Sequence, residues 1–183
     1  MIENIIYREN YIASPENAYQ TLLEEIAWLS VQARRKEAFM AKEHTEYKYI
    51  DGVPTAPIYI STPYHSVVES IQTRINQEFS CNMDLCFLNY YADQHQALGW
   101  HSDNSPVINQ EEPIVVISLG EVRELWVRNI GYQGEVLPQN RFKLDNGSVF
   151  IMPPGFQNAY QHKIPKSGRE MGGRISLTFR SKK

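Results

Sequence analysis

The chain has 183 residues, of which 42% are hydrophobic and 21% charged, and its formal net charge is −3 at pH 7. This length suits a single domain, 1–183, with a substantial core, and no repeat or low-complexity stretch divides it. The slightly acidic balance argues against an electrostatic attraction of the whole surface to nucleic acid and leaves local basic clusters as candidates for such a role.

Targeting signals and cysteines bear on the compartment. We expect no signal peptide, and no apolar run reaches the length of a membrane span. Its two cysteines, Cys81 and Cys86, would face opposite sides of a strand, so no disulfide between them is expected. We therefore expect a cytoplasmic protein that does not bind membranes, and separately we predict a monomer.

In chain order, residues 1–33 predict a strand followed by a helix. The apolar residues at the start favour a short strand or an extended cover for the core. Ser14 is expected to cap the helix N-terminus, with Pro15 in the first turn. The helical spacing of apolar residues extends this helix to about Ser30.

Residues 34–60 lack a regular period and mix charged with aromatic side chains. An irregular segment of this length in a compact domain is usually functional or disordered, so we predict a hairpin lid. The alternative is a surface hairpin whose tyrosines only cover the core. A basic cluster, 34–36, lies at the start of the segment.

The rest of the chain predicts a second helix and then a β-rich domain. Pro63 begins the helix, whose apolar face extends to Phe79. From residue 85 onward, short apolar segments alternate with turns, which is typical of a jelly-roll sandwich. The expected strands are 85–91, 114–119, 125–130, 142–144, 148–152, 157–163 and 175–179. The predicted fold class is α+β, mainly β, with two N-terminal supporting helices and a jelly-roll core at 85–183.

One pair of residues indicates a metal site. His101 and Asp103 are two residues apart, so on an extended segment their side chains point to the same face. With His162 from a second segment they would form the 2-His-1-carboxylate triad that binds non-heme Fe(II). Such a pair taken alone is more commonly part of a surface loop or a hydrogen-bonded core histidine.

Two arginines add to the metal hypothesis. Arg174 and Arg180 are six residues apart, so on a strand they project from the same face. Buried guanidinium groups need anionic partners. A small dicarboxylate, bound by a guanidinium at one end and by the metal at the other, would satisfy both requirements.

Several motifs occur in a recognisable order along the chain. They are Asn89-x-Tyr91, Trp100-His101-Ser-Asp103, Ile117-Ser-Leu-Gly120 followed by Arg123, Leu144-x-x-Gly147-Ser148 leading to Met152, Tyr160-x-His162 and Arg174-x-Ser-Leu-Thr-Phe-Arg180. Through them the chain resembles the AlkB-type Fe(II) and 2-oxoglutarate-dependent dioxygenases from about Arg34 to Arg180. The resemblance implies a double-stranded β-helix with the metal at one open end between two sheets.

The resemblance also implies the cofactors and the residues that bind them. The triad would hold Fe(II) as the catalytic centre, with 2-oxoglutarate and O2 as cosubstrates. Arg174 would bind the distal carboxylate of 2-oxoglutarate, and Arg180 would support its other end. Asn89 and Tyr91 would hydrogen-bond the cosubstrate beside Ser176, which stands where the family often has asparagine.

The implied reaction is oxidative demethylation of alkylated nucleobases in DNA or RNA, with release of formaldehyde and succinate. The lid would recognise the nucleotide, and the base must be flipped or single-stranded, single strands being favoured. The expected substrate-binding residues are Arg35, Tyr47, Tyr49, Asn104, Ser105 and Arg123. The family usually has acidic residues directly after the metal aspartate, whereas Asn104-Ser105 follows here. We therefore predict a preference for a neutral modified base or an altered substrate.

Two alternatives belong to other functional classes. The first is the same oxygenase chemistry acting on a protein or a small molecule. It would leave the basic clusters, 34–36 and Lys163 with Lys166 and Arg169, without a phosphate to bind, and the salt dependence of binding distinguishes it. The second is a non-catalytic reader of modified nucleic acid, which would have no use for costly buried charges.

Overall fold

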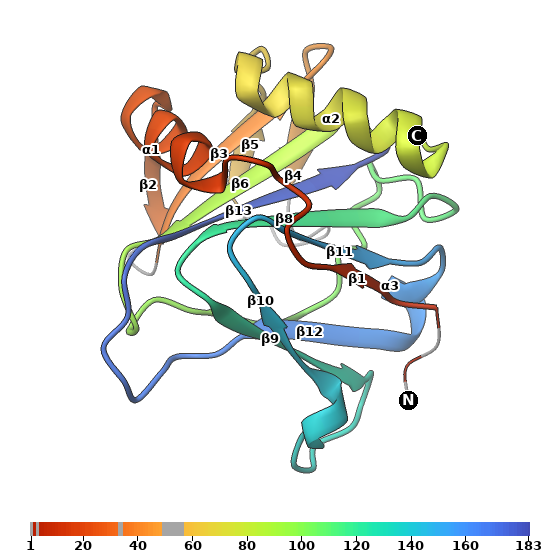
Figure 1. Ribbon diagram of the computed structural model, residues 1–183. Coiled ribbons are helices and arrows are strands. Elements are labelled where there is room, and N and C mark those ends of the chain that lie inside the picture. The colour runs from red at the N-terminus through yellow and green to blue at the C-terminus, as the bar shows by residue number, and fades with distance from the viewer. Residues whose placement is uncertain (1, 3, 33–34, 49–56) are drawn as a thin grey trace.

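The computed structural model describes residues 2, 4–32, 35–48 and 57–183, with 31 and 32 described by their backbone alone. Its described part is built on two facing antiparallel sheets (Figure 1). The large sheet has the order β1 (Ile6–Arg8), β11 (Ser148–Met152), β8 (Ile114–Gly120), β13 (Arg174–Arg180), β6 (Leu85–Tyr91), β3 (Arg35–Ala41) and β2 (Leu29–Gln32). The small sheet has the order β10 (Arg141–Leu144), β9 (Arg123–Asn129), β12 (Tyr160–Ile164) and β7 (Leu98–His101). This arrangement is consistent with the predicted jelly roll.

Two helices cover the outer face of the large sheet, α1 (Pro15–Glu25) and α2 (Ser66–Phe79) (Figure 1). Their apolar stripes join one cluster with the outward residues of the sheet strands. Leu22 of α1 and Ile75 of α2 are fully buried there. Each such side chain contributes roughly 1.5–3 kcal/mol through removal of apolar surface from water. This face is core and carries no chemistry.

The inner face of the large sheet carries a row of polar side chains. The register aligns Glu37 with Asn89, Asn89 with Ser176, Ser176 with Ser118, and Ser118 with Ser148. Residues directly opposite one another in a sheet point to the same face. All five are buried. Buried polar groups need partners, and in this row Arg35 contacts Glu37 and Asn89, while Arg174 Nε donates to Ser118.

The two helices differ in their limits from the sequence prediction. Helix α1 ends at Glu25, not near Ser30, because the chain becomes extended at Ile26 and then pairs with β3 as β2. Ser14 stands at the N-cap, but its side chain makes no capping hydrogen bond. Helix α2 begins at Ser66, three residues after the predicted Pro63.

The strands after residue 85 occur where the sequence placed them, with two differences. The predicted strand 157–163 is instead a short helix, α3 (Phe156–Ala159), followed by β12. Strand β7, which ends at His101, adds the edge of the small sheet. The jelly-roll sheets are also not confined to 85–183, because β1, β2 and β3 extend the large sheet.

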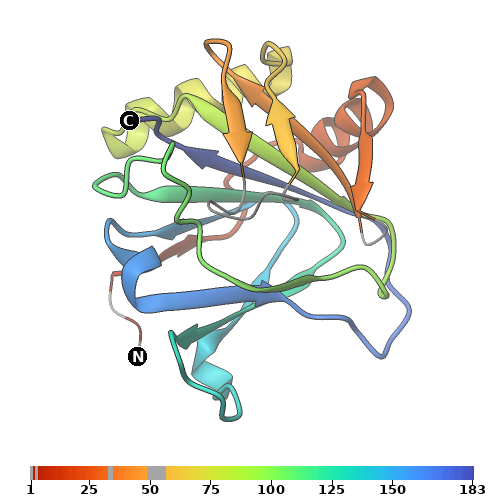
Figure 2. The same cartoon turned by 180° about the vertical axis from the view of Figure 1, so that it is seen from behind.

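The predicted lid, 34–60, proves to be two structures. Its first part is β3, a strand of the large sheet, because the inward Arg35 and Glu37 satisfy one another's charge. Its second part is a small antiparallel hairpin of β4 (Glu46–Lys48) and β5 (Ile58–Ile60), visible in Figure 2. The segment between these strands, with Tyr49, lies outside the described residues.

Two smaller expectations can be compared with the structure. Cys81 and Cys86 are free thiols, which confirms that they form no disulfide with each other. None of the described helices is both long and apolar enough to cross a membrane.

Candidate metal and cosubstrate site

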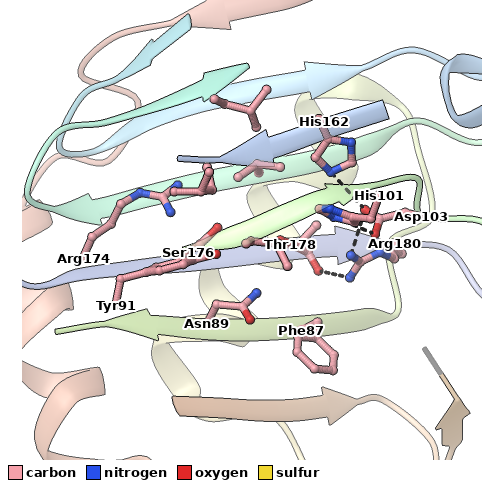
Figure 3. Close-up of a pocket in the computed structure, with 14 residues that line it drawn as sticks. Phe87, Asn89, Tyr91, His101, Asp103, His162, Arg174, Ser176, Thr178 and Arg180 are labelled. Carbon is pink, nitrogen blue, oxygen red and sulfur yellow. Dashed lines mark hydrogen bonds and ion pairs between the residues drawn. The ribbon is translucent and has the colours of Figure 1, made fainter. Parts of the chain in front are cut away.

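Three candidate metal ligands meet between the sheets. His101 ends β7, Asp103 follows two residues later, and His162 stands opposite His101 in the register of β12 with β7. One ligand atom from each lies within 4.8 Å of the others. The Nε2 atoms of His101 and His162 are 3.7 and 3.9 Å from the two carboxylate oxygens of Asp103 (Figure 3). The structure thus brings together the triad that the sequence predicted.

Hydrogen bonds to the backbone fix the orientation of this triad. His101 Nδ1 donates to the carbonyl oxygen of Gly99 at 2.9 Å, which leaves its Nε2 as a lone pair directed at Asp103. The backbone N–H of Asp103 donates to Gln157 Oε1 at 2.8 Å, and its carbonyl accepts from Gln110 Nε2 at 2.9 Å. The two glutamines therefore hold the turn that presents the carboxylate.

The electrostatics of the triad favour the protonation states that bind a metal. Burial acts to raise the pKa of Asp103, but Arg180, His162 and His101 together lower it to about 2. Burial lowers the pKa of His162 to about 3, helped by the nearby His101, and it also lowers the pKa of His101. The site therefore holds one carboxylate and two neutral imidazoles. Asp103 Oδ1 has no hydrogen-bond partner among the described residues, so this donor set fits a divalent cation.

Arg174 forms the other end of the same space. Its side chain is fully buried, and its Nε donates to Ser118 Oγ at 2.7 Å. Within the part of the chain that the structure describes, Nη1 and Nη2 have no hydrogen-bond partner. Burial lowers the pKa of Arg174 to about 10, so the group remains a cation at neutral pH. A buried cation with two open N–H groups fits a carboxylate bound through both nitrogens.

One cavity joins the triad to Arg174, and we call it the inter-sheet cavity. Figure 3 shows the triad with Arg180 at one end and Arg174 at the other, with Ser176 and Thr178 between them. All five residues predicted to bind 2-oxoglutarate line it: Asn89, Tyr91, Arg174, Ser176 and Arg180. Its remaining lining is largely apolar and consists of Phe87, Leu98, Val116, Leu125, Ile164 and Thr178.

Arg180 and Asn89 are held by specific partners within this cavity. Arg180 Nη2 lies 2.9 Å from Asp103 Oδ2, and its Nη1 donates to the carbonyl of Thr178. Asn89 Oδ1 accepts from Arg35 Nε at 2.7 Å. Because the amide oxygen is engaged, the NH2 group is the part of Asn89 that is left for the cavity.

The predicted substrate residues are more scattered. Arg35 is buried and contacts Asn89 and Glu37, so it does not form an exposed basic cluster. Tyr47 is buried against Phe39 and Phe87, which matches the alternative that the lid tyrosines cover the core.

The loop after the metal aspartate and Arg123 complete this set. Asn104 is exposed, whereas Ser105 is buried and donates from Oγ to the carbonyl of Lys48 at 3.1 Å. Arg123 is also buried, and its terminal nitrogens donate to the carbonyls of Asp93, Gln96 and Pro165. The guanidinium of Arg123 thus ties together two loops, and a substrate contact for this residue stays a prediction.

Sequence reasoning missed four residues that position the site. Ser118 lies inside a quoted motif, yet only the strand register shows that it orients Arg174. Glu37 shares its face with Arg35, and a charge pair two residues apart on a strand is a signal that could have been used. Nothing local marks Gln110 and Gln157, because their contacts with Asp103 depend on the tertiary fold.

The class of protein follows from this geometry and from comparison with known families. The family model described as the 2OG-Fe(II) oxygenase superfamily matches residues 16–180, and the chain belongs to that family. The solved structure of OsALKBH1 shares the fold, with a TM-score of 0.63 and 15% identity over 99% of this chain and 98% of that one.

Several curated relatives of this chain carry AlkB names. Alpha-ketoglutarate-dependent dioxygenase alkB homolog 3 of Homo sapiens is 28% identical over 123 residues, which are 64% of this chain and 43% of that protein. DNA oxidative demethylase ALKBH2 of Mus musculus is 26% identical over 157 residues, 84% of this chain and 63% of that protein. The chain spans about two-fifths of the length of the alkB homolog 3 relatives. The chain is thus a member of the 2OG-Fe(II) oxygenase superfamily and is similar to relatives that carry AlkB names.

Proposed function

We propose that this protein is an Fe(II)/2-oxoglutarate-dependent dioxygenase that oxidatively demethylates alkylated nucleobases in DNA or RNA, releasing formaldehyde and succinate. The observation that carries the proposal is one cavity with a 2-His-1-carboxylate triad at one end and a buried, open guanidinium at the other. The names of the relatives support a nucleic-acid substrate, since ALKBH2 is described as a DNA oxidative demethylase.

In this proposal the protein's own residues bind, orient and exclude water. His101, Asp103 and His162 would hold Fe(II), and Arg174 would bind the distal carboxylate of 2-oxoglutarate. When bound, the metal, the cosubstrate and O2 supply the oxidation that hydroxylates an N-methyl group. Arg180 keeps the Asp103 carboxylate ionised and in place. The apolar lining of the cavity keeps bulk water from the oxidising centre.

Asn89 would position the cosubstrate between the two ends. Its amide oxygen is engaged by Arg35, whose Nη2 lies 2.5 Å from Glu37 Oε1. The hydroxyl of Tyr59, on β5, donates to the other oxygen of Glu37. This chain of contacts fixes which side of the amide points into the cavity, so Asn89 would donate from Nδ2 to an oxygen of 2-oxoglutarate.

The substrate base would be neutral rather than cationic. No carboxylate directly follows Asp103 in the chain, and the exposed Asn104 stands in its place. The buried carboxylate of Glu37 cannot compensate, because Arg35 neutralises it. A cationic methylated base would thus find no counter-charge from these residues. We further propose that the hairpin β4–β5 contributes to nucleotide recognition, that single strands are preferred, and that the protein acts as a cytoplasmic monomer.

The decisive experiment is an assay with anaerobically reconstituted Fe(II) protein. Oligonucleotides carrying either cationic or neutral methylated bases are incubated with 2-oxoglutarate, and succinate and oligonucleotide mass are followed, with His101→Ala as control. Loss of one CH2 unit only with the intact triad is expected. Succinate without any change in the oligonucleotides would overturn the nucleic-acid substrate and favour a protein or small molecule. A strong preference for 1-methyladenine or 3-methylcytosine would overturn the neutral-base proposal.

A further inference from the structure

The outer face of the small sheet carries a second concentration of chemistry, on the side turned away from the inter-sheet cavity. Along β9 the buried residues alternate with partly exposed ones, and β12 alternates in the same way around His162. In Figures 1 and 2 the small sheet forms the layer opposite α1 and α2, and its outer face is turned away from both helices. This face therefore presents side chains to solvent from every strand of the sheet.

Two indoles and three cations interleave across this face. Arg141 lies 4.6 Å from the ring centre of Trp126, and Lys163 Nζ lies 4.4 Å from the same ring. Lys163 Nζ is also 4.8 Å from the ring centre of Trp100, and Arg128 is 4.2 Å from it. We call this set, which takes residues from β10, β9, β12 and β7, the cation–indole row: Arg141, Trp126, Lys163, Trp100 and Arg128.

The charges of the row are only partly balanced. Glu124 accepts a hydrogen bond from Trp126 Nε1, and Glu135 pairs with Arg141 at 3.2 Å. Across the described residues, no carboxylate forms an ion pair with Arg128 or Lys163. Arg128 Nη2 donates to the neutral Gln161, and its Nε has no hydrogen-bond partner in the described part of the chain. Two neighbouring cations therefore remain available to an external anion, although the whole chain is slightly acidic.

The position of the row relates it to the proposed active site. Strand β7 is the edge of the small sheet, and it carries Trp100 on the outer side directly before His101 on the inner side. Lys163 likewise follows His162 on β12. A chain whose base enters the cavity can therefore pass over the β7 edge and continue along the row. The sequence groups Lys163 with Lys166 and Arg169 in one basic cluster, but the alternation of the strand turns Lys163 to the face opposite His162.

We propose that the cation–indole row is a second contact surface for single-stranded nucleic acid, which binds the nucleotides that flank the base in the active site. The cations would contact phosphates, and the indoles would contact bases, since aromatic rings next to basic groups form such platforms. An acidic protein partner would use the cations but not the indoles. The proposal rests on the proposed nucleic-acid substrate.

The test measures binding of a fluorescently labelled, unmodified single-stranded oligonucleotide to the full chain by anisotropy at several salt concentrations. The row variant is Arg128→Gln with Lys163→Gln. The matched control is Lys42→Gln with Lys183→Gln, which removes the same charge from exposed positions outside the small sheet. Thermal melts verify that both variants fold.

We expect the row variant to weaken binding and to reduce the slope of log K against log salt by about 1.4, because each lost phosphate contact on a single strand contributes about 0.7. Equal weakening by the control variant would overturn the proposal, since net charge alone would then explain binding. Equal displacement of the oligonucleotide by polyglutamate would also overturn it, because a general polyanion site needs no bases.

The indoles have a readout of their own in tryptophan fluorescence. The third tryptophan, Trp28, packs against Tyr90 in the helix-side core and is remote from the row. Binding should quench the wild-type fluorescence but not that of Trp100→Leu with Trp126→Leu, and affinity should fall roughly five- to 150-fold per lost stacking contact. Unchanged quenching in that variant would refute base contact.

The two proposals can fail separately. His101→Ala should abolish demethylation yet keep row-dependent binding of the oligonucleotide. If binding depends on the row but the wild-type protein demethylates no base, the proposed function is refuted and the second contact surface stands. If the protein demethylates a base and the row variant binds with wild-type affinity, only the proposed contact surface is refuted.

Discussion

Replacing Arg35 by methionine should destabilise the protein strongly, because it leaves the buried carboxylate of Glu37 without its cation. Glu37 is fully buried, and its Oε1 is 2.5 Å from Arg35 Nη2. Removing one partner of a buried ion pair costs about 3–5 kcal/mol of unfolding free energy. The hydroxyl of Tyr59 would remain as a hydrogen-bond donor to Glu37, so we expect the lower part of this range. Urea unfolding followed by circular dichroism measures the loss.

A double-mutant cycle separates the pair from its surroundings. Arg35→Met combined with Glu37→Gln should recover more than half of the loss, since no buried charge then lacks a partner. Additive losses, or a cost for Arg35→Met below about 1 kcal/mol as for a surface pair, would refute the reasoning. Arg123→Met is the matched control, because it removes a buried arginine that contacts neither Glu37 nor Asn89.

The same variant should also weaken 2-oxoglutarate binding. Arg35 Nε holds the amide oxygen of Asn89 at 2.7 Å, so without it the amide can turn its oxygen towards the cosubstrate. Calorimetric titration of the Mn(II)-loaded protein should show weaker binding for Arg35→Met and for Asn89→Ala, and little further loss when both are combined. Independent losses would show that Arg35 acts on the cosubstrate by another route.

Three further predictions concern the ends of the cavity. Arg174→Met should weaken 2-oxoglutarate binding by about 2–5 kcal/mol in the same titration. It should also stabilise the ligand-free protein to urea, because it removes a buried cation that has no counter-charge. A lower stability of this variant would count against a guanidinium with open N–H groups. The metal-free protein should lose stability as pH falls below about 6.5 towards 3, by up to about 1.4 kcal/mol per pH unit. The reason is that His162 binds a proton in the unfolded state but not in the folded state, where its pKa is about 3. In urea unfolding with chelator, the unfolding free energy of His162→Gln should depend less steeply on pH. Asp103, whose pKa in the folded state is about 2, contributes stability that is present above about pH 3.9 and is lost as pH falls towards 2. Arg180→Met should move this acid-induced loss to higher pH. An unchanged midpoint of acid unfolding would argue against the ion pair of Arg180 with Asp103.

The sequence predicted the strands after residue 85 because buried strands leave continuous apolar runs between turn residues. It also predicted the cavity residues, since fixed spacings place Arg174 and Arg180 on one face of a strand whatever the rest of the chain does. Strand β3 was not predicted, because the charged residues Arg35 and Glu37 give this segment the pattern of a polar loop. Their opposite charges two residues apart are visible in the sequence, but the contacts with Asn89 and with the Tyr59 hydroxyl come from other strands and depend on the tertiary fold.

The sequence also did not predict on which face of the small sheet each basic residue lies. Lys163 is adjacent to His162, so the sequence alone places the basic cluster of Lys163, Lys166 and Arg169 beside the metal ligand. Alternation along β12 separates the two by the thickness of the small sheet, so neighbours in sequence serve opposite faces. The predicted strand 157–163 obscured this alternation, because its first residues are helical in α3.

The charges around the inter-sheet cavity explain why its two ends belong to one site. Arg35 is paired with Glu37 and Arg180 with Asp103, so each of these cations is compensated within the fold. Arg174 is the exception among these arginines, because its terminal nitrogens meet no acceptor in the described residues. A dianion with one end at Arg174 compensates that cation, while its other end lies beside the triad, where a divalent cation would offset the second charge. Either ligand alone leaves a charge uncompensated in a buried space. The triad and Arg174 therefore favour joint occupation, and the fold retains one costly buried cation to obtain it.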